Sequence, residues 1–136
     1  MRVTGLGFRR GVSAESLRAA IALVGLGDAL ATAEDKVREP GLMRVAQDLG
    51  VGILGIARCD LRAQGVEGSA RVMAEYETGS VAEAAALAGA GPGARLVQTK
   101  RKGPDGMAVA ALAEGALTEA GLTEAALTGS VAKGQV

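Results

Sequence analysis

The stretch that decides the fold is Arg2–Glu15, which reads RVTGLGFRRGVSAE. A short apolar strand, Arg2–Leu6, leads into a glycine-rich turn that contains Arg9 and Arg10. Glycine lets the backbone turn tightly and approach a ligand closely. Ser13 is a suitable N-cap for a helix that follows the turn. The stretch therefore predicts a strand, a turn and a helix in direct succession.

The residues of this turn are of the kind that bind anions. A helix N-terminus presents free N–H groups and a partial positive charge, so phosphate or carboxylate groups bind there. Gly7, Gly11 and Ser13, together with the two arginines, would complete such a site. A plain connection with solvated arginines is an equal alternative, because isolated glycine-rich turns often hold no ligand.

Strands and helices continue to alternate along the chain. Leu17, Ala20, Ile21 and Val24 have helical spacing and predict one buried face. A strand is expected next at Ala29–Thr32, followed by a helix that begins at Pro40, with its apolar face at Leu42, Val45, Ala46 and Leu49 and with Gly50 as the C′ residue. A strand at Val51–Ala57 follows, and then a helix from Ser80 to Ala88 with Ser80 and Glu83 as its capping box. The last expected elements are strands at Ala94–Thr99 and Met107–Ala111. Leu61 and Ser69–Met73 indicate two further short helices.

This alternation predicts an α/β fold. We expect a three-layer α/β/α arrangement around a mostly parallel five-stranded sheet that ends in an antiparallel hairpin, with residues 100–106 as its turn. The nearly continuous apolar run at Val51–Ala57 is typical of a strand covered on both faces. We assign residues 1–112 to this domain and residues 113–136 to a C-terminal helix or a partly disordered tail.

Composition excludes several classes of site. The 136-residue chain has no histidine and one cysteine, which rules out histidine-dependent catalysis, an intrachain disulfide, and zinc or iron sites built on these residues. The net charge is zero and aromatic residues are nearly absent, so a nucleic-acid partner is not expected. No apolar run is long enough for a membrane span and no signal-peptide pattern begins the chain, so we expect a cytoplasmic protein.

Charged and glycine-containing segments border the predicted strands at several points. In doubly wound sheets, ligands bind at the carboxyl ends of the parallel strands, where these segments would meet. Lys36 pairing locally with Asp35 or Glu39, and a solvated hairpin turn, are the alternatives to binding. The candidate ligand-binding residues are Gly7, Arg9, Arg10, Gly11, Ser13, Thr32, Lys36, Glu39, Gly79, Ser80, Lys100, Arg101 and Lys102. No catalytic residue, metal ligand or cofactor site is identified.

Four segments in this order resemble the CobE family and the related C-terminal domain of CbiG, both of cobalamin biosynthesis. They are Gly5–Glu15, Ala31–Leu42 with Lys36 and Glu39-Pro40-Gly41, Gly79–Leu87, and Ala94–Val97 followed by Lys100-Arg101-Lys102. The resemblance covers about Arg2 to Leu112 and implies an α/β/α domain that handles a corrin-ring intermediate, of the precorrin or hydrogenobyrinic acid type.

Such intermediates carry many acetate and propionate groups, which suit a rim formed by Arg9, Arg10, Lys36 and residues 100–102. The resemblance implies a binding, protecting or transfer role in the aerobic pathway. The alternative is a CbiG-type hydrolase that opens a ring lactone with loss of a two-carbon fragment, with Asp35, Glu39, Ser13 or Ser80 as its reacting groups. Full-length CbiG proteins carry further N-terminal sequence, which favours the binding role here. Other enzymes of the pathway are expected partners, and a homodimer stays open.

Overall fold

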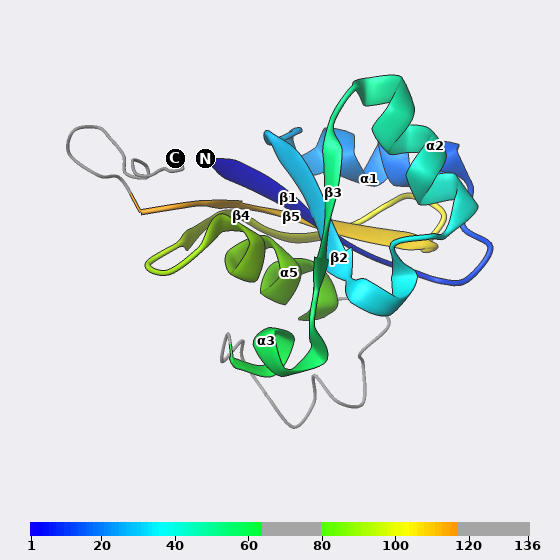
Figure 1. Ribbon diagram of the computed structural model, residues 1–136. Coiled ribbons are helices and arrows are strands. Elements are labelled where there is room, and N and C mark those ends of the chain that lie inside the picture. The colour runs from blue at the N-terminus through cyan, green and yellow to red at the C-terminus, as the bar shows by residue number, and fades with distance from the viewer. Residues whose placement is uncertain (64–79, 117–136) are drawn as a thin grey trace.

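A computed structural model describes residues 1–63 and 80–116 of the chain. Its elements alternate as the sequence predicts (Figure 1). In chain order they are β1 (Arg2–Phe8), α1 (Ala14–Val24), β2 (Ala29–Ala33), the 3-10 helix η1 (Glu34–Lys36), α2 (Pro40–Leu49), β3 (Gly52–Ile56), α3 (Arg58–Ala63), α5 (Ser80–Ala90), β4 (Arg95–Lys102) and β5 (Ala108–Glu114). The α/β class and the short helix around Leu61 are confirmed.

The sheet has five strands in the order β3-β2-β1-β5-β4. The pairings of β1 with β2 and of β2 with β3 are parallel, whereas β5 pairs antiparallel with both β1 and β4. The final hairpin is therefore confirmed, but the expectation of a mostly parallel sheet is partly wrong. The reason is that β5 inserts between β1 and β4, so β4 runs in the direction of β1 without pairing with it.

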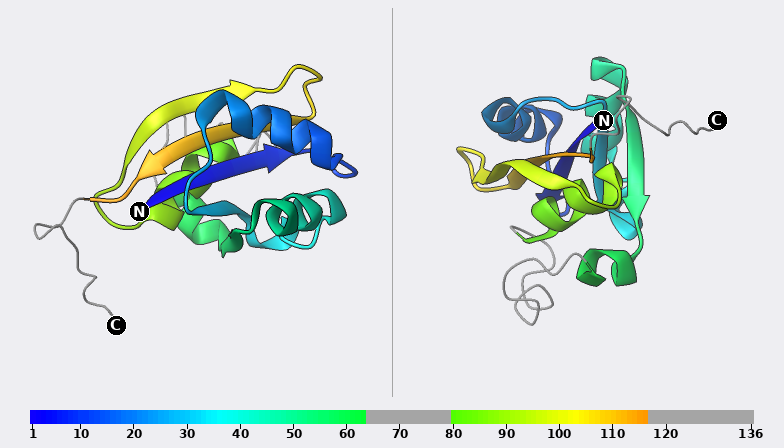
Figure 2. Two further views of the ribbon diagram at one scale, coloured as in Figure 1. Left: turned by 90° about the horizontal axis from the view of Figure 1, so that it is seen from above. Right: turned by 90° about the vertical axis from the view of Figure 1, so that its left-hand side faces the viewer.

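Helices α1 and α2 cover one face of the sheet, and the two further views show helices on both sides of it (Figure 2). Leu17, Ala20, Ile21 and Val24 are all buried, which confirms the helical period of the sequence. Their cluster includes Leu6 and Phe8 from β1 and the Leu42–Val45–Ala46 face of α2. Leu49 stays 37% exposed, so the predicted apolar face of α2 ends one turn earlier.

Helices α5 and α3 cover the other face. The alanines of α5 let it approach β1 closely, and Gly5 is the point of contact. A Cβ atom on Gly5 would lie 2.6 Å from the backbone nitrogen of Ala86, and closer still to the carbonyl oxygen of Ala82. Gly5 therefore serves helix–sheet packing within the strand, and the turn itself depends on Gly11, which has a φ of 83°.

Several boundaries differ from the sequence expectations. β3 is an edge strand in which only Ile56 is buried, so its two faces are only partly covered. Residues 100–102 belong to β4 rather than to the turn, because this exposed edge strand tolerates charged residues and two irregularities in its register. β5 continues to Glu114, three residues beyond the strand predicted at Met107–Ala111. Ser69–Met73 and residues 117–136 lie outside the described residues. Among residues 1–63 and 80–116, no helix is long and apolar enough to cross a membrane.

Candidate functional site at the carboxyl edge of the sheet

One edge of the sheet gathers most of the predicted site residues. β1, β2, β3 and β4 all end there, and α1 and α2 begin there because each follows one of these strands. The first turn of α5 also reaches this edge, since the Glu83 carboxylate accepts a hydrogen bond from the backbone N–H of Lys100 at 3.0 Å. We call the segments 9–13, 34–41 and 100–107 at this edge the carboxyl rim.

The loop between β1 and α1 is fixed by its backbone. Val12 N–H donates to the carbonyl of Arg9 at 3.1 Å, and Arg9 N–H donates to the carbonyl of Met107 in the β4–β5 hairpin, also at 3.1 Å. The side chains of Arg9 and Arg10 are exposed, as is Gly11. The loop therefore presents two guanidinium groups from a backbone that the hairpin helps to hold.

The N-terminus of α2 packs directly on this loop. The Glu39 carboxylate accepts a hydrogen bond from Gly11 N–H at 2.8 Å. Gly41 lies so close to the Val12 carbonyl that a Cβ atom could not fit between them. The loop after β1 and the start of α2 are thus in contact at the rim, and the carboxylate of Glu39 already accepts a hydrogen bond from one N–H group of the turn.

Lys36 is directed to the end of β1. Its Nζ donates to the carbonyl of Phe8 at 2.9 Å and lies 5.4 Å from the centre of the Phe8 ring. Asp35 instead lies 3.8 Å from Arg58, so the local ion pairs considered for Lys36 are not what positions it. The ammonium group is half-buried beside the arginine-bearing loop, where it adds positive charge to the rim.

Ser13, Ser16 and Asp105 join α1 to the hairpin. Ser13 is the predicted N-cap, and its hydroxyl accepts a hydrogen bond from Ser16 N–H at 3.0 Å. The Ser16 hydroxyl donates to the Asp105 carboxylate, which also accepts from Met107 N–H at 3.0 Å. These hydrogen bonds, the one from Ser16 foremost, hold the pKa of Asp105 below its usual value. Sequence reasoning missed this contact, because 89 residues separate its partners and neither belongs to a motif.

The three basic residues at the end of β4 do not all face the same way. Arg101 is opposite Ala110, which packs on the α1 face of the sheet, whereas Lys102 is opposite Val109, which packs on the α5 face. Residues opposite one another in antiparallel strands share a face, so Arg101 and Lys102 flank the sheet on opposite sides. Lys100 precedes them at a register irregularity.

The remaining candidates take other places. Gly7 is buried in β1, where it pairs with Val109. Thr32 is 1% exposed, and its hydroxyl donates to the carbonyl of Leu6 at 2.8 Å, so it links β2 to β1. Ser80 begins α5, and Gly79 lies outside the described residues.

The basic side chains of the rim are available to bind a ligand. Arg9, Arg10, Lys100, Arg101 and Lys102 are exposed, and no residue within 1–63 and 80–116 forms an ion pair with them. The nearby carboxylates of Glu39, Glu83 and Asp105 accept hydrogen bonds from backbone or hydroxyl groups. The rim can therefore attract a polyanion, with guanidinium groups suited to bidentate carboxylate binding.

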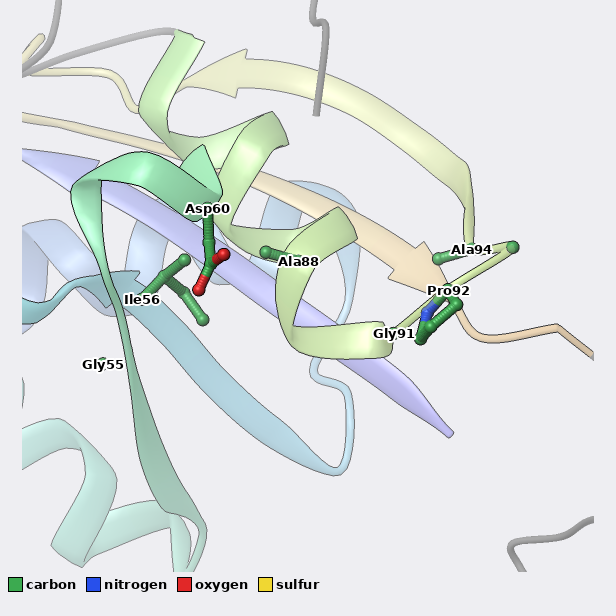
Figure 3. A pocket seen from close by; sticks show the side chains of 8 residues that line it. Gly55, Ile56, Asp60, Ala88, Gly91, Pro92 and Ala94 are labelled. Atoms are coloured by element: carbon green, nitrogen blue, oxygen red, sulfur yellow. The ribbon is translucent and has the colours of Figure 1, made fainter. Parts of the chain in front are cut away.

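A separate pocket of about 410 Å³ lies on the opposite side of the sheet from α1 (Figure 3). Gly55, Ile56 and Asp60 line one side of it, and Ala88 with residues 91–94 line the other. None of the predicted site residues is among these. Within the described part of the chain, no cluster of three or more histidine, cysteine or acidic side chains could hold a metal ion.

Comparisons with known proteins agree with this architecture. The family model described as Cobalamin synthesis G C-terminus matches residues 2–113. A search of the curated proteins finds no significant match.

Solved structures give the same family. The crystal structure of CobE, a protein from the cobalamin (vitamin B12) biosynthetic pathway, is 37% identical, with a TM-score of 0.69 over 83% of this chain and 92% of that one. Cobalamin biosynthesis protein chiG from Agrobacterium tumefaciens strain C58 is 34% identical, with a TM-score of 0.64 over 85% of this chain and 99% of that one. A putative cobalamin biosynthesis protein G homolog from Sulfolobus solfataricus, at 19% identity and a TM-score of 0.55 over 82% of this chain and 36% of that one, shares the fold. The chain therefore belongs to the family of the cobalamin synthesis G C-terminus.

Proposed function

We propose that this protein binds a polycarboxylate corrin intermediate of cobalamin biosynthesis at the carboxyl rim, and that it holds the intermediate or passes it to another enzyme of the pathway. Family membership supports the link to this pathway. The observation that carries the proposal is that Arg9 and Arg10 are exposed, with no ion-pair partner among residues 1–63 and 80–116, on a loop that the Glu39 carboxylate anchors.

The chemistry of the ligand matches this arrangement. A corrin intermediate is a wide ring with carboxylates around its periphery, so it needs several anion-binding groups spread along a rim. Arg9 and Arg10 lie at the centre of the carboxyl rim. Lys36 lies beside them at the end of β1, and Arg101 and Lys102 extend the rim to the end of β4. Long-range attraction between these cations and the ligand adds to the direct contacts.

The acidic groups of the rim are engaged in holding the loops. Glu39 accepts from Gly11, and Asp105 accepts from Ser16 and Met107 with a lowered pKa. A carboxylate with a lowered pKa is a weak general base. We therefore favour binding over acid–base chemistry at Asp105.

The test is a titration of the purified protein with a cobalt-free corrin that carries free carboxylates, followed by absorbance and by co-elution on a sizing column. The matched ligand is the same corrin with its carboxylates amidated. The proposal expects co-elution of the first and much weaker binding of the second. Equal binding of both would contradict it. Conversion of a lactone-bearing intermediate by this protein alone would instead establish a CbiG-type hydrolase.

A further inference from the structure

The two edges of the sheet are built differently. The outer edge of β4 carries Arg95, Lys100, Arg101 and Lys102, all exposed, and its register with β5 is irregular at two points. Positive charge and irregular register are devices that prevent an edge strand from pairing with another chain. The β4 edge is therefore protected.

The β3 edge has no such protection. Its sequence, Gly52-Ile53-Leu54-Gly55-Ile56, contains no charge and no proline, and its register with β2 is unbroken over all five residues. Within the described sheet β3 pairs with β2 alone. Ile53 and Leu54 are half-exposed, and they pack partly against the cores on the two faces of the sheet. An apolar, regular edge of this kind favours the addition of another strand.

We propose that β3 pairs antiparallel with β3 of a second copy of this chain, across a two-fold axis at Leu54. In this register Ile53 lies opposite Gly55 of the second copy, and Gly52 lies opposite Ile56. Ile53 and Ile56 thus each lie opposite a glycine, and Leu54 lies opposite Leu54 of the second copy. Cross-strand pairs that share a face are the unit of sheet stabilisation, and a two-fold interface requires this self-complementarity.

The surroundings of the glycines fit this pairing. A side chain at Gly52 would meet no atom within 4 Å, so the strand leaves open space there. At Gly55 a Cβ atom would lie 3.0 Å from Val37 and 3.2 Å from the backbone of Glu34, so only a residue without a side chain fits beside this segment. The half-exposed Val37 would extend the apolar surface available to Ile53 of the second copy. Five paired residues make a small interface, toward or below about 1,200 Å², so we expect a dissociation constant on the order of micromolar.

Sedimentation velocity over a wide concentration range tests the proposal, with Gly52→Lys as the disrupting variant. The added charge has room, so the fold is retained, but it lies on the pairing edge. The matched control is Leu26→Lys, which places the same charge at an apolar residue that is 43% exposed, outside the sheet. We expect a concentration-dependent dimer for the wild type and Leu26→Lys, and self-association at least about tenfold weaker for Gly52→Lys.

Disulfide cross-linking tests the register and does not depend on the folding of Gly52→Lys. In a Cys59→Ser background, Leu54→Cys is expected to cross-link the two copies rapidly, because the two residues face each other at the axis. Ile53→Cys is expected to cross-link much more slowly, since it faces Gly55 and lies about 7–8 Å diagonally from its equivalent. A monomer at all concentrations, a dimer that survives Gly52→Lys, or equal cross-linking of both cysteines would overturn the proposal.

Discussion

The carboxylate of Glu39 accepts a hydrogen bond from the backbone N–H of Gly11 at 2.8 Å. The contact joins the start of α2 to the glycine-rich turn after β1, and it places an acidic group of the chain where the turn was expected to bind an anion. Arg9 and Arg10, which directly precede Gly11, thus project from a loop that is anchored by a carboxylate.

Replacing Glu39 by alanine is expected to lower the free energy of unfolding by about 0.5–1.5 kcal/mol, the usual range for one hydrogen bond. Glu39→Gln retains an acceptor for Gly11 N–H and should cost less. Urea unfolding of the three proteins measures the difference. Equal stability of the alanine variant and the wild type would show that the Gly11 contact does not hold the loop.

Gly5→Ala is expected to destabilise the fold by about 3 kcal/mol or more, at the upper end of the range for overpacked cores. The added methyl group would collide with the backbone of α5 at Ala82 and Ala86, which cannot move independently of the helix. The control is Gly52→Ala, which adds the same group to β3 in open space and should change stability by less than about 1 kcal/mol. Similar thermal unfolding of both variants would refute close packing of α5 on β1.

Asp105 is expected to titrate below its ordinary pKa of 3.8, chiefly because the Ser16 hydroxyl donates to it. A lowered pKa in the folded state stabilises the protein above this ordinary value, and the contribution is lost as the pH falls through the folded pKa. Ser16→Ala should therefore raise the pKa of Asp105 in an NMR titration. Ser13→Ala leaves the Ser16 hydroxyl in place, so the pKa of Asp105 should stay low in this variant. An unchanged Asp105 pKa in Ser16→Ala would exclude the hydrogen bond between Ser16 and Asp105.

High salt is expected to weaken corrin binding strongly. At about 1 M ionic strength the Debye length falls to about 3 Å, which screens the exposed cations of the rim from the ligand carboxylates. Calorimetric titrations at low and high salt measure the effect. Affinity that does not depend on salt would point to apolar contacts with the ring in place of the rim charges.

The sequence predicts the elements whose signals are local. The spacing of Leu17, Ala20, Ile21 and Val24 identifies α1, and Pro40 marks the start of α2, because each pattern depends on neighbours within one helix. The charged end of β4 predicts a turn instead of a strand, because an exposed edge strand has the same charged composition as a solvated loop.

Relationships between distant segments could not be predicted in this way. The sequences of β1 and β4 contain no pattern that indicates that β5 inserts between them, because the pairing of β1 with β5 is set by packing. The position of Arg9, Arg10 and Lys36 at the carboxyl edge follows from the ends of β1 and β2, which local patterns predict. Thr32 and Gly7 flank these loops in sequence, but strand periodicity alone does not show that both are buried.

The most direct test compares corrin binding by two double variants that remove the same charge. Arg9→Gln with Arg10→Gln neutralises the centre of the rim, whereas Arg2→Gln with Arg95→Gln neutralises two arginines near Glu114 at the opposite end of β1. We expect the first pair to weaken binding of a free-carboxylate corrin by about tenfold or more, and the second to leave it within about twofold. Wild-type affinity in the Arg9 and Arg10 variant, or an equal loss in both, would contradict a carboxylate-binding site at the carboxyl rim.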